Sequence, residues 1–301
     1  MITGIVIRIF KYLHKTVFFS IDNRKEHLLN LFTSGLYFAI TFIALHYIGH
    51  AWSTSNAHLE GYTPLFSYNG MDSLLGTTGW SARKIGFIFL MPPFTGIIAL
   101  IVGLISLRLA RTKQVHFRTF MFWLSLNGLL MYASYVTTAY LSGLNFNSKF
   151  FTGFVSLYAW FFWEDITIYG VLFIQTLLCI PILLYFGRLI LSLNYSNSLL
   201  KQKNGRIIIW INVVVIPFAI GVLIVGAATI PKDFGYQFAR IATFFPMSVI
   251  MVAGMHLFST KNIVVIKGGM NGVSTAILIT ATVLLIVLTR TVLSISTGPL
   301  W

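Results

Sequence analysis

The sequence predicts an all-α protein, a polytopic transmembrane helix bundle, and three observations support this fold class. Hydrophobic residues make up 57% of the chain, and its mean hydropathy is +0.84. Only 9% of its 301 residues are charged, whereas soluble domains carry about 25%, so too few solvated groups are present to cover a globule. The apolar residues gather in continuous runs of near-bilayer length. These observations exclude a soluble protein.

About seven spans account for most of the chain. Each is an apolar run of roughly 20 residues, bounded by charged residues or by Gly, Pro and Asn. The predicted spans are 28–50, 86–107, 119–142, 166–193, 207–230, 239–259 and 271–295. Residues 23–301 therefore form a single transmembrane domain in this interpretation, without a separate extramembrane domain.

Residues 1–22 are predicted to form an amphipathic helix that lies along the membrane surface. On a helical wheel the basic residues Arg8, Lys11 and Lys15 fall opposite a face of aliphatic and aromatic residues. Charge interrupts the apolar residues too often for a cleavable signal sequence, and no small-residue cleavage site follows. We expect the basic face to bind the anionic headgroups of the lipid bilayer.

Two segments between the spans are expected at the outer surface. The stretch between the first two spans contains Pro64 and several glycines and is too polar to cross the membrane, so we expect a loop or short helix there. Residues 143–165 are short and aromatic, and Tyr158 is among the side chains expected to anchor them at the membrane interface. The aromatic residues predicted to make interfaces are Trp80, Phe150, Trp160 and Trp163.

The distribution of basic residues predicts the orientation. With a cytoplasmic N-terminus, fifteen Lys and Arg residues fall in inside segments and five in outside segments. This bias follows the positive-inside rule. We therefore expect an integral protein of a bacterial inner membrane, with the N-terminus in the cytoplasm and the C-terminus outside. The same rule explains the net charge of +14 without a nucleic-acid partner. The single cysteine, Cys179, excludes an internal disulfide.

Ionisable residues inside a bilayer are rare and costly, so each one is a candidate functional residue. The candidates are His46, His50, Glu164, Asp165, Arg240, His256 and Arg290. His46 and His50 are four residues apart on a predicted helix, so their side chains point the same way and can bind one metal ion.

Topology predicts that carboxylates lie near this histidine pair. The first span ends near His50 at the outer face, and the fourth begins there, next to Glu164 and Asp165. Two imidazoles and one carboxylate would make a three-ligand zinc site with an open fourth position. His256 lies about 25 Å deeper at 1.5 Å per residue, so it does not join this site. The regularly spaced methionines before it, from Met247 to Met255, are expected to be a packing stripe.

The run Leu45-His46-Tyr47-Ile48-Gly49-His50-Ala51 resembles the zinc motif of the site-2 protease family of intramembrane metallopeptidases. Fainter similarities are the turn at 91–96, Asn127 in the third span and the acidic pair downstream, and together they cover roughly residues 30–170. The resemblance implies an intramembrane zinc site in which a Glu after the first His is the general base. Here that position is Tyr47.

The departures from the family pattern imply a degenerate, non-catalytic member. An unperturbed tyrosine has a pKa near 10, too high to take a proton from metal-bound water at neutral pH. The ligand motif of the third helix is also missing, because Asn127 is followed by Gly128. We expect a pseudoenzyme that binds other membrane proteins as an accessory subunit of a membrane complex.

Other interpretations stay open at this point. The chain is alternatively an active zinc metallopeptidase with Glu60 or Glu164 as a substitute base, or a small transporter or electron-carrier subunit. The histidine pair is alternatively structural, with Glu164 or Asp165 as its ion-pair partner. A haem would need an axial ligand from a second helix, since His46 and His50 lie on one face of the same helix.

Overall fold

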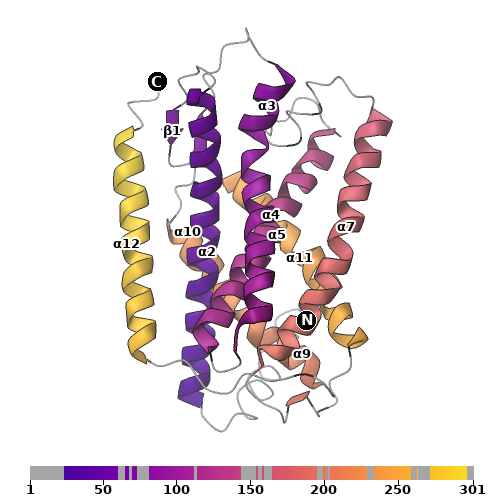
Figure 1. Ribbon diagram of the computed structural model, residues 1–301. Coiled ribbons are helices and arrows are strands. Elements are labelled where there is room, and N and C mark those ends of the chain that lie inside the picture. Colours follow the sequence, from indigo (N-terminus) through magenta and orange to yellow (C-terminus); the bar gives the residue numbers. More distant parts are fainter. Residues whose placement is uncertain are drawn as a thin grey trace, which may run out of the picture.

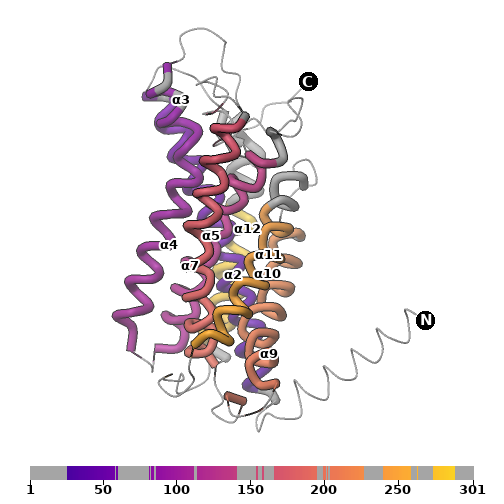
Figure 2. Tube along the Cα trace, turned by 90° about the vertical axis from the view of Figure 1, so that its right-hand side faces the viewer, coloured from indigo at the N-terminus to yellow at the C-terminus, as the bar shows by residue number. Residues whose placement is uncertain are grey.

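The computed structural model confirms an all-α architecture of upright helices (Figure 1). It describes residues 24–59, 65–67, 70–72, 81–111, 114–143, 165–194, 204–228, 234–258 and 272–296, and the single positions 154, 158, 199, 200, 202 and 263. The predicted surface helix with Arg8, Lys11 and Lys15 lies outside these residues. The same upright packing is visible after a quarter turn (Figure 2).

Helices occupy nearly all of the described chain. They are α2 (Arg24–Leu59), α3 (Ala82–Phe89), α4 (Met91–Leu109), α5 (Val115–Gly143), α7 (Asp165–Ser192), α9 (Gly205–Trp210), the π-helical segment η1 (Ile211–Val215), α10 (Ile216–Ala228), α11 (Phe234–Leu257) and α12 (Gly272–Ser296). A short antiparallel hairpin of β1 (Leu65–Ser67) and β2 (Gly70–Asp72) follows α2.

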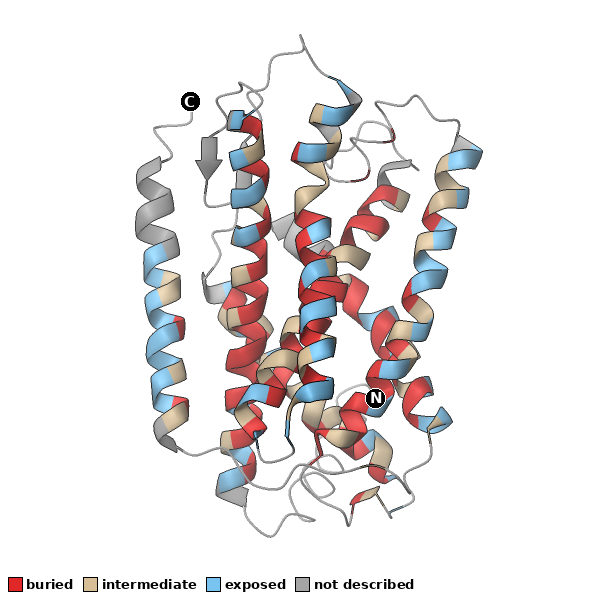
Figure 3. Cartoon of the chain, in the orientation of Figure 1, coloured by how far each residue is buried: buried red, intermediate tan, exposed pale blue. Residues whose placement is uncertain are grey.

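Five of the described helical stretches are long and apolar enough to cross a membrane. They are Glu26–Ala57, Met91–Leu109, Ile166–Ser192, Gly205–Gly226 and Arg240–Leu257. Exposed residues cover the outward faces of α4, α7 and α12, whereas α2 and α5 are largely buried (Figure 3). Large apolar side chains on those outward faces match a lipid environment. These features agree with an integral membrane protein.

Helix α5 is absent from that set, although it has 29 residues. Polar side chains lower the hydropathy of this helix. Hydrogen bonds to α2 satisfy some of them. The indole Nε1 of Trp123 donates to Ser34 Oγ at 2.8 Å, and the Tyr37 hydroxyl lies 3.0 Å from His116 Nδ1. A helix surrounded by protein can carry such groups, whereas a lipid-facing helix cannot.

Helix α2 continues to Leu59, beyond the predicted end of the first span at residue 50. Polar side chains on its extension hold α3 in place. Ser53 Oγ donates to the carbonyl of Ile88, and Asn56 Nδ2 donates to the carbonyl of Phe87 at 2.8 Å. The predicted second span is divided between α3 and α4 at Leu90, because the prolines that open α4 lack an N–H and suit a helix start.

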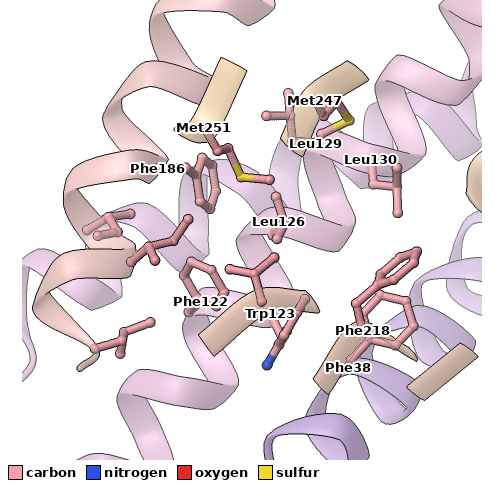
Figure 4. Packing of buried hydrophobic residues seen from close by; sticks show 14 of the residues in the cluster. Phe38, Phe122, Trp123, Leu126, Leu129, Leu130, Phe186, Phe218, Met247 and Met251 are labelled. Carbon is pink, nitrogen blue, oxygen red and sulfur yellow. The ribbon is translucent and has the colours of Figure 1, made fainter. Parts of the chain in front are cut away.

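The core is rich in aromatic residues contributed by five helices (Figure 4). Phe38 of α2 packs edge-on against Trp123 of α5, with ring centroids 5.2 Å apart, and against Phe218 of α10 at the same distance. Phe218 in turn stacks on Phe244 of α11, with centroids 3.6 Å apart. This layer ties α2, α5, α10 and α11 together near the middle of the bundle.

The methionine stripe of α11 is part of the same core. Met247, Met251 and Met255 are 4%, 0% and 1% exposed, and the first two are seen beside Phe186 and Leu129 in Figure 4. The prediction of a packing stripe is confirmed. An unbranched, polarizable side chain fills gaps between rings well.

Glycines set the closest helix–helix contacts. Between α4 and α5, a Cβ added to Gly128 would lie 2.5 Å from the carbonyl oxygen of Gly96. Between α7 and α11, a Cβ added to Gly187 would lie 2.5 Å from the carbonyl carbon of Gly254. Small residues at these positions let the backbones approach, as is common where packing rather than the hydrophobic effect joins membrane helices.

The span that contains α9 and α10 is interrupted by the π-helical segment η1. The N–H of Ile216 bonds to the carbonyl of Ile211, five residues back. Pro217 follows at once and has no N–H, so it cannot continue the regular ladder. The wider turn accommodates one extra residue ahead of the proline.

Candidate functional site: a histidine pair beside a buried arginine

His46 and His50 lie on successive turns of α2 and touch each other. Their ring centroids are 4.6 Å apart, and the ring planes meet at 69°. His46 is buried and His50 is half-buried. The helical spacing explains this geometry, because residues four apart share one face of an α-helix.

Arg240 of α11 completes the group. It is 0% exposed, and its guanidinium carbon lies 3.9 Å from the ring centroid of Phe42, one turn before His46. Phe42 and His46 share one face of α2, so the positive charge lies on the face that carries the histidine pair. Phe42 lies near the middle of the apolar stretch Glu26–Ala57, so the positive charge sits deep within the bundle. Sequence reasoning identified Arg240 as an intramembrane ionisable residue, but no sequence signal paired it with α2.

Tyr47 occupies the position where the family motif has its general base. Its ring packs edge-on against His46, with centroids 5.1 Å apart. The residue is half-buried. A phenol thus stands beside the imidazole where a carboxylate would be needed to activate water at neutral pH.

The described side chains alone do not complete a zinc site. Among them, no three His, Cys, Asp or Glu residues gather. The two imidazoles share their surroundings with a guanidinium that stays protonated under all ordinary conditions, and this like charge opposes a dication. His46 Nδ1 is buried without a hydrogen-bond partner in the described part of the chain, so an imidazole donor is present but the ligand set is incomplete.

The carboxylates predicted to approach the pair lie outside the described part of the chain. Glu164 lies outside the described residues, and Asp165 opens α7 with a side chain that is also outside them. Their contact with His46 and His50 stays a prediction. The side chain of Arg290, and the aromatic residues Trp80, Phe150, Trp160 and Trp163, likewise lie outside the described part.

Asn127 has a structural role in the contact between α5 and α2. Its Nδ2 donates to the carbonyl of Phe38 at 3.0 Å and to Thr41 Oγ1 at 2.7 Å. The residue is 0% exposed. The Asn127 amide therefore joins α5 to α2 at a level more than one turn before His46. Its contacts do not support a role as a metal ligand.

Tyr158 differs from its expected environment, whereas His256 lies away from the histidine pair as expected. Tyr158, expected at the membrane interface, is 4% exposed and packs with Leu45 and Phe154. Its hydroxyl lies 3.4 Å from Gln175 Oε1 of α7, which gives the phenol a polar partner away from water. His256 is exposed in the last turn of α11, at the opposite end of that helix from Arg240.

Sequence reasoning missed one buried arginine at the other end of the bundle. Arg118 of α5 is 9% exposed, and its guanidinium donates to the carbonyl of Ala110 at 3.1 Å and to Ser192 Oγ at 3.4 Å. It therefore joins the α4–α5 turn to the end of α7. The positive-inside rule accounts for the position of Arg118 in the sequence but not for this contact between helices.

No protein-family model, curated protein or solved structure matches the chain. The resemblance to the site-2 protease family therefore rests on the histidine pair and its apolar frame. It stays a prediction.

Proposed function

We propose that the protein is a non-catalytic, multi-pass membrane protein that serves as a protein-binding or accessory subunit of a membrane complex. The observation that carries this proposal is the position of Arg240, whose guanidinium lies over Phe42 on the face of α2 that also carries His46 and His50. A peptidase zinc site needs anionic or neutral ligands and an adjacent base. Here the neighbours of the imidazoles are a cation and the phenol of Tyr47.

Of the two arguments against a peptidase site, the positive charge of Arg240 is the stronger. A guanidinium near the pair repels a dication, and this repulsion weakens zinc binding where no carboxylate offsets it. The missing base alone costs about 10²–10⁴-fold in rate. Together these effects favour a binding role over catalysis.

The shape of the chain supports the accessory role. Its described helices form one bundle whose outward faces are apolar, so contacts with other membrane proteins are available along α4, α7 and α12. We expect the aromatic outer segments, around Tyr62 to Trp80 and Phe150 to Trp163, to contribute to these contacts. Aromatic residues are enriched in the cores of protein interfaces.

The finer topology belongs to the same proposal. We propose seven spans, in which α5 and α12 join the five apolar stretches, on a scaffold like that of a site-2 protease. Helix α5 has 29 residues and α12 has 25, and both exceed the length needed to cross a bilayer. The positive-inside bias supports a cytoplasmic N-terminus, an outer C-terminus and an inner-membrane location.

Metal analysis tests the site. We expect purified protein to hold no stoichiometric zinc, and His46→Ala to leave the metal content unchanged. About one zinc per chain, lost in His46→Ala, would contradict the proposal. Cleavage of a co-expressed single-span substrate by the natural protein would contradict it as well, whereas cleavage gained only with Tyr47→Glu would indicate an inactivated peptidase.

Purification tests the accessory role. Extraction in a mild detergent should bring down membrane proteins in fixed stoichiometry with the chain. A monodisperse single chain under the same conditions, with no partner after chemical crosslinking in membranes, would refute this role.

A further inference from the structure

Two arginines converge on the last turn of α11, at the end of the bundle where α9 lies (Figure 1). Arg206 of α9 donates from Nη1 to the carbonyl of Met255 at 2.7 Å. The guanidinium carbon of Arg188 of α7 lies 6.0 Å from the ring centroid of Phe258. Met255 and Phe258 are within one helical turn, so both positive charges belong to one locality.

The three helices that bring these arginines together, α7, α9 and α11, contribute no acidic residue at this end of the bundle. Between residues 166 and 301 the chain contains one acidic residue, Asp233, which directly precedes the opposite end of α11. Arg188 is exposed, and within the described chain its recorded contact is the Phe258 ring. A guanidinium has five N–H donors, so Arg206 keeps most of its capacity after bonding to Met255.

An exposed apolar stripe on α7 leads to Arg188. Leu178, Pro181 and Tyr185 precede it at spacings of three and four residues, which places all of them on one face of the helix. All are exposed, Leu178 by 61% and Tyr185 by 38%. An acyl chain lying along this stripe would bring its headgroup to the arginine.

We propose that Arg188 and Arg206 form a binding site for the phosphate headgroup of an anionic phospholipid. Both lie beside the ends of apolar stretches, Ile166–Ser192 and Arg240–Leu257, where headgroups are found. Arginine recognises phosphate through paired, charge-assisted N–H bonds. Basic pockets between helices at the cytoplasmic side are a recurring means of binding such lipids.

A purely structural role explains only one of the two arginines. Arg206 satisfies a carbonyl at the end of α11, which is an ordinary use of a basic side chain at a helix C-terminus. Arg188 makes no such bond within the described residues, and its guanidinium lies over the Phe258 ring, a contact that uses none of its N–H groups. The lipid site accounts for both. It does not depend on the histidine pair, and its placement at the cytoplasmic side rests on the orientation proposed above.

Lipid binding to the full-length protein tests the site. Native mass spectrometry would count bound phosphatidylglycerol and phosphatidylcholine, with inorganic phosphate as a separate addition. We expect phosphatidylglycerol to bind in preference to phosphatidylcholine, and Arg188→Gln to weaken its binding about tenfold, which corresponds to about 1.4 kcal/mol. Arg206→Lys, which keeps the charge and loses the paired geometry, should weaken binding less.

Arg83→Gln is the matched control. Arg83 is also exposed and lies over an aromatic ring, with its guanidinium carbon 5.7 Å from the Phe87 centroid, but it is at the opposite end of the bundle. Equal losses in Arg83→Gln and Arg188→Gln would overturn the site, as would equal binding of the two lipids. An Arg188-dependent response to inorganic phosphate as strong as that to the lipid would overturn the assignment to a phospholipid.

Discussion

Replacing Gly187 by alanine should separate α7 from α11. An ideal Cβ at this position would lie 2.5 Å from the carbonyl carbon of Gly254 and 2.6 Å from the carbonyl oxygen of Met251. Unstrained contacts between heavy atoms are about 3.5–4.0 Å, so the helices must move apart by about 1 Å. Both obstructing atoms belong to the backbone, so no side chain can turn away to make room.

The cost follows from two effects. Overpacking a tight contact typically costs 1–3 kcal/mol, and a gap of 0.5–1 Å forfeits about a quarter to a half of the dispersion energy of neighbouring contacts. We expect a destabilisation of about 3 kcal/mol. On the scale of soluble domains of 150–250 residues, this lowers Tm by roughly 6–12 °C.

Gly170→Ala on the same helix is the control, since an added Cβ there meets nothing within 4 Å. Alanine loses less backbone entropy on folding than glycine does, so that variant should be unchanged or more stable by up to about 1 kcal/mol. Thermal unfolding of both variants in one detergent, followed by intrinsic fluorescence, gives the comparison. Equal Tm values for the two variants would refute the inference that this contact requires glycine.

Three other outcomes are expected. Asn127→Ala removes two buried hydrogen bonds to α2 and should cost about 2–4 kcal/mol in thermal or denaturant unfolding, whereas Asn56→Ala, at the surface, should cost under about 1 kcal/mol. Burial lowers the pKa of His116, which precedes the predicted third span. The contribution of His116 to stability is therefore present above its unfolded pKa of about 6.5 and is lost as pH falls. His116→Gln should flatten the decline in Tm below pH 6.5, and an unchanged slope would contradict this. Reporter fusions after residues 200 and 301 should report cytoplasm and exterior respectively, and the reverse pattern would overturn the proposed orientation.

The fold class was predictable because a membrane imposes a strong compositional signal. Long apolar runs mark helices whatever their neighbours are. The break at Leu90 was harder to locate, since the prolines at the start of α4 lie within an apolar run and hydropathy does not register their missing N–H groups. The length of α2 was underestimated because its polar end is stabilised by bonds to α3, which are tertiary contacts.

The candidate site was predictable in part. The spacing of His46 and His50 fixes their common face, and the cost of burying charge identified Arg240 as a candidate. The contact of Arg240 with the Phe42 ring joins α2 to a helix almost 200 residues later, and no local pattern encodes such a pairing. The same limit applies to Arg188 and Arg206, whose shared neighbour is the end of a third helix.

The π-helical segment η1 has a consequence for the two halves of its span. The extra residue in η1 rotates the side chains of α9 about the helix axis by about 100° relative to those of α10. Phe218 can therefore face the aromatic core while Arg206, on the other side of the segment, reaches the end of α11. A one-residue deletion within Ile211–Val215 would remove the extra residue and swing Arg206 away from Met255, while Pro217 would still leave one bond of the helix unmade. Because of this rotation, the two halves of one span contact two different sets of neighbours.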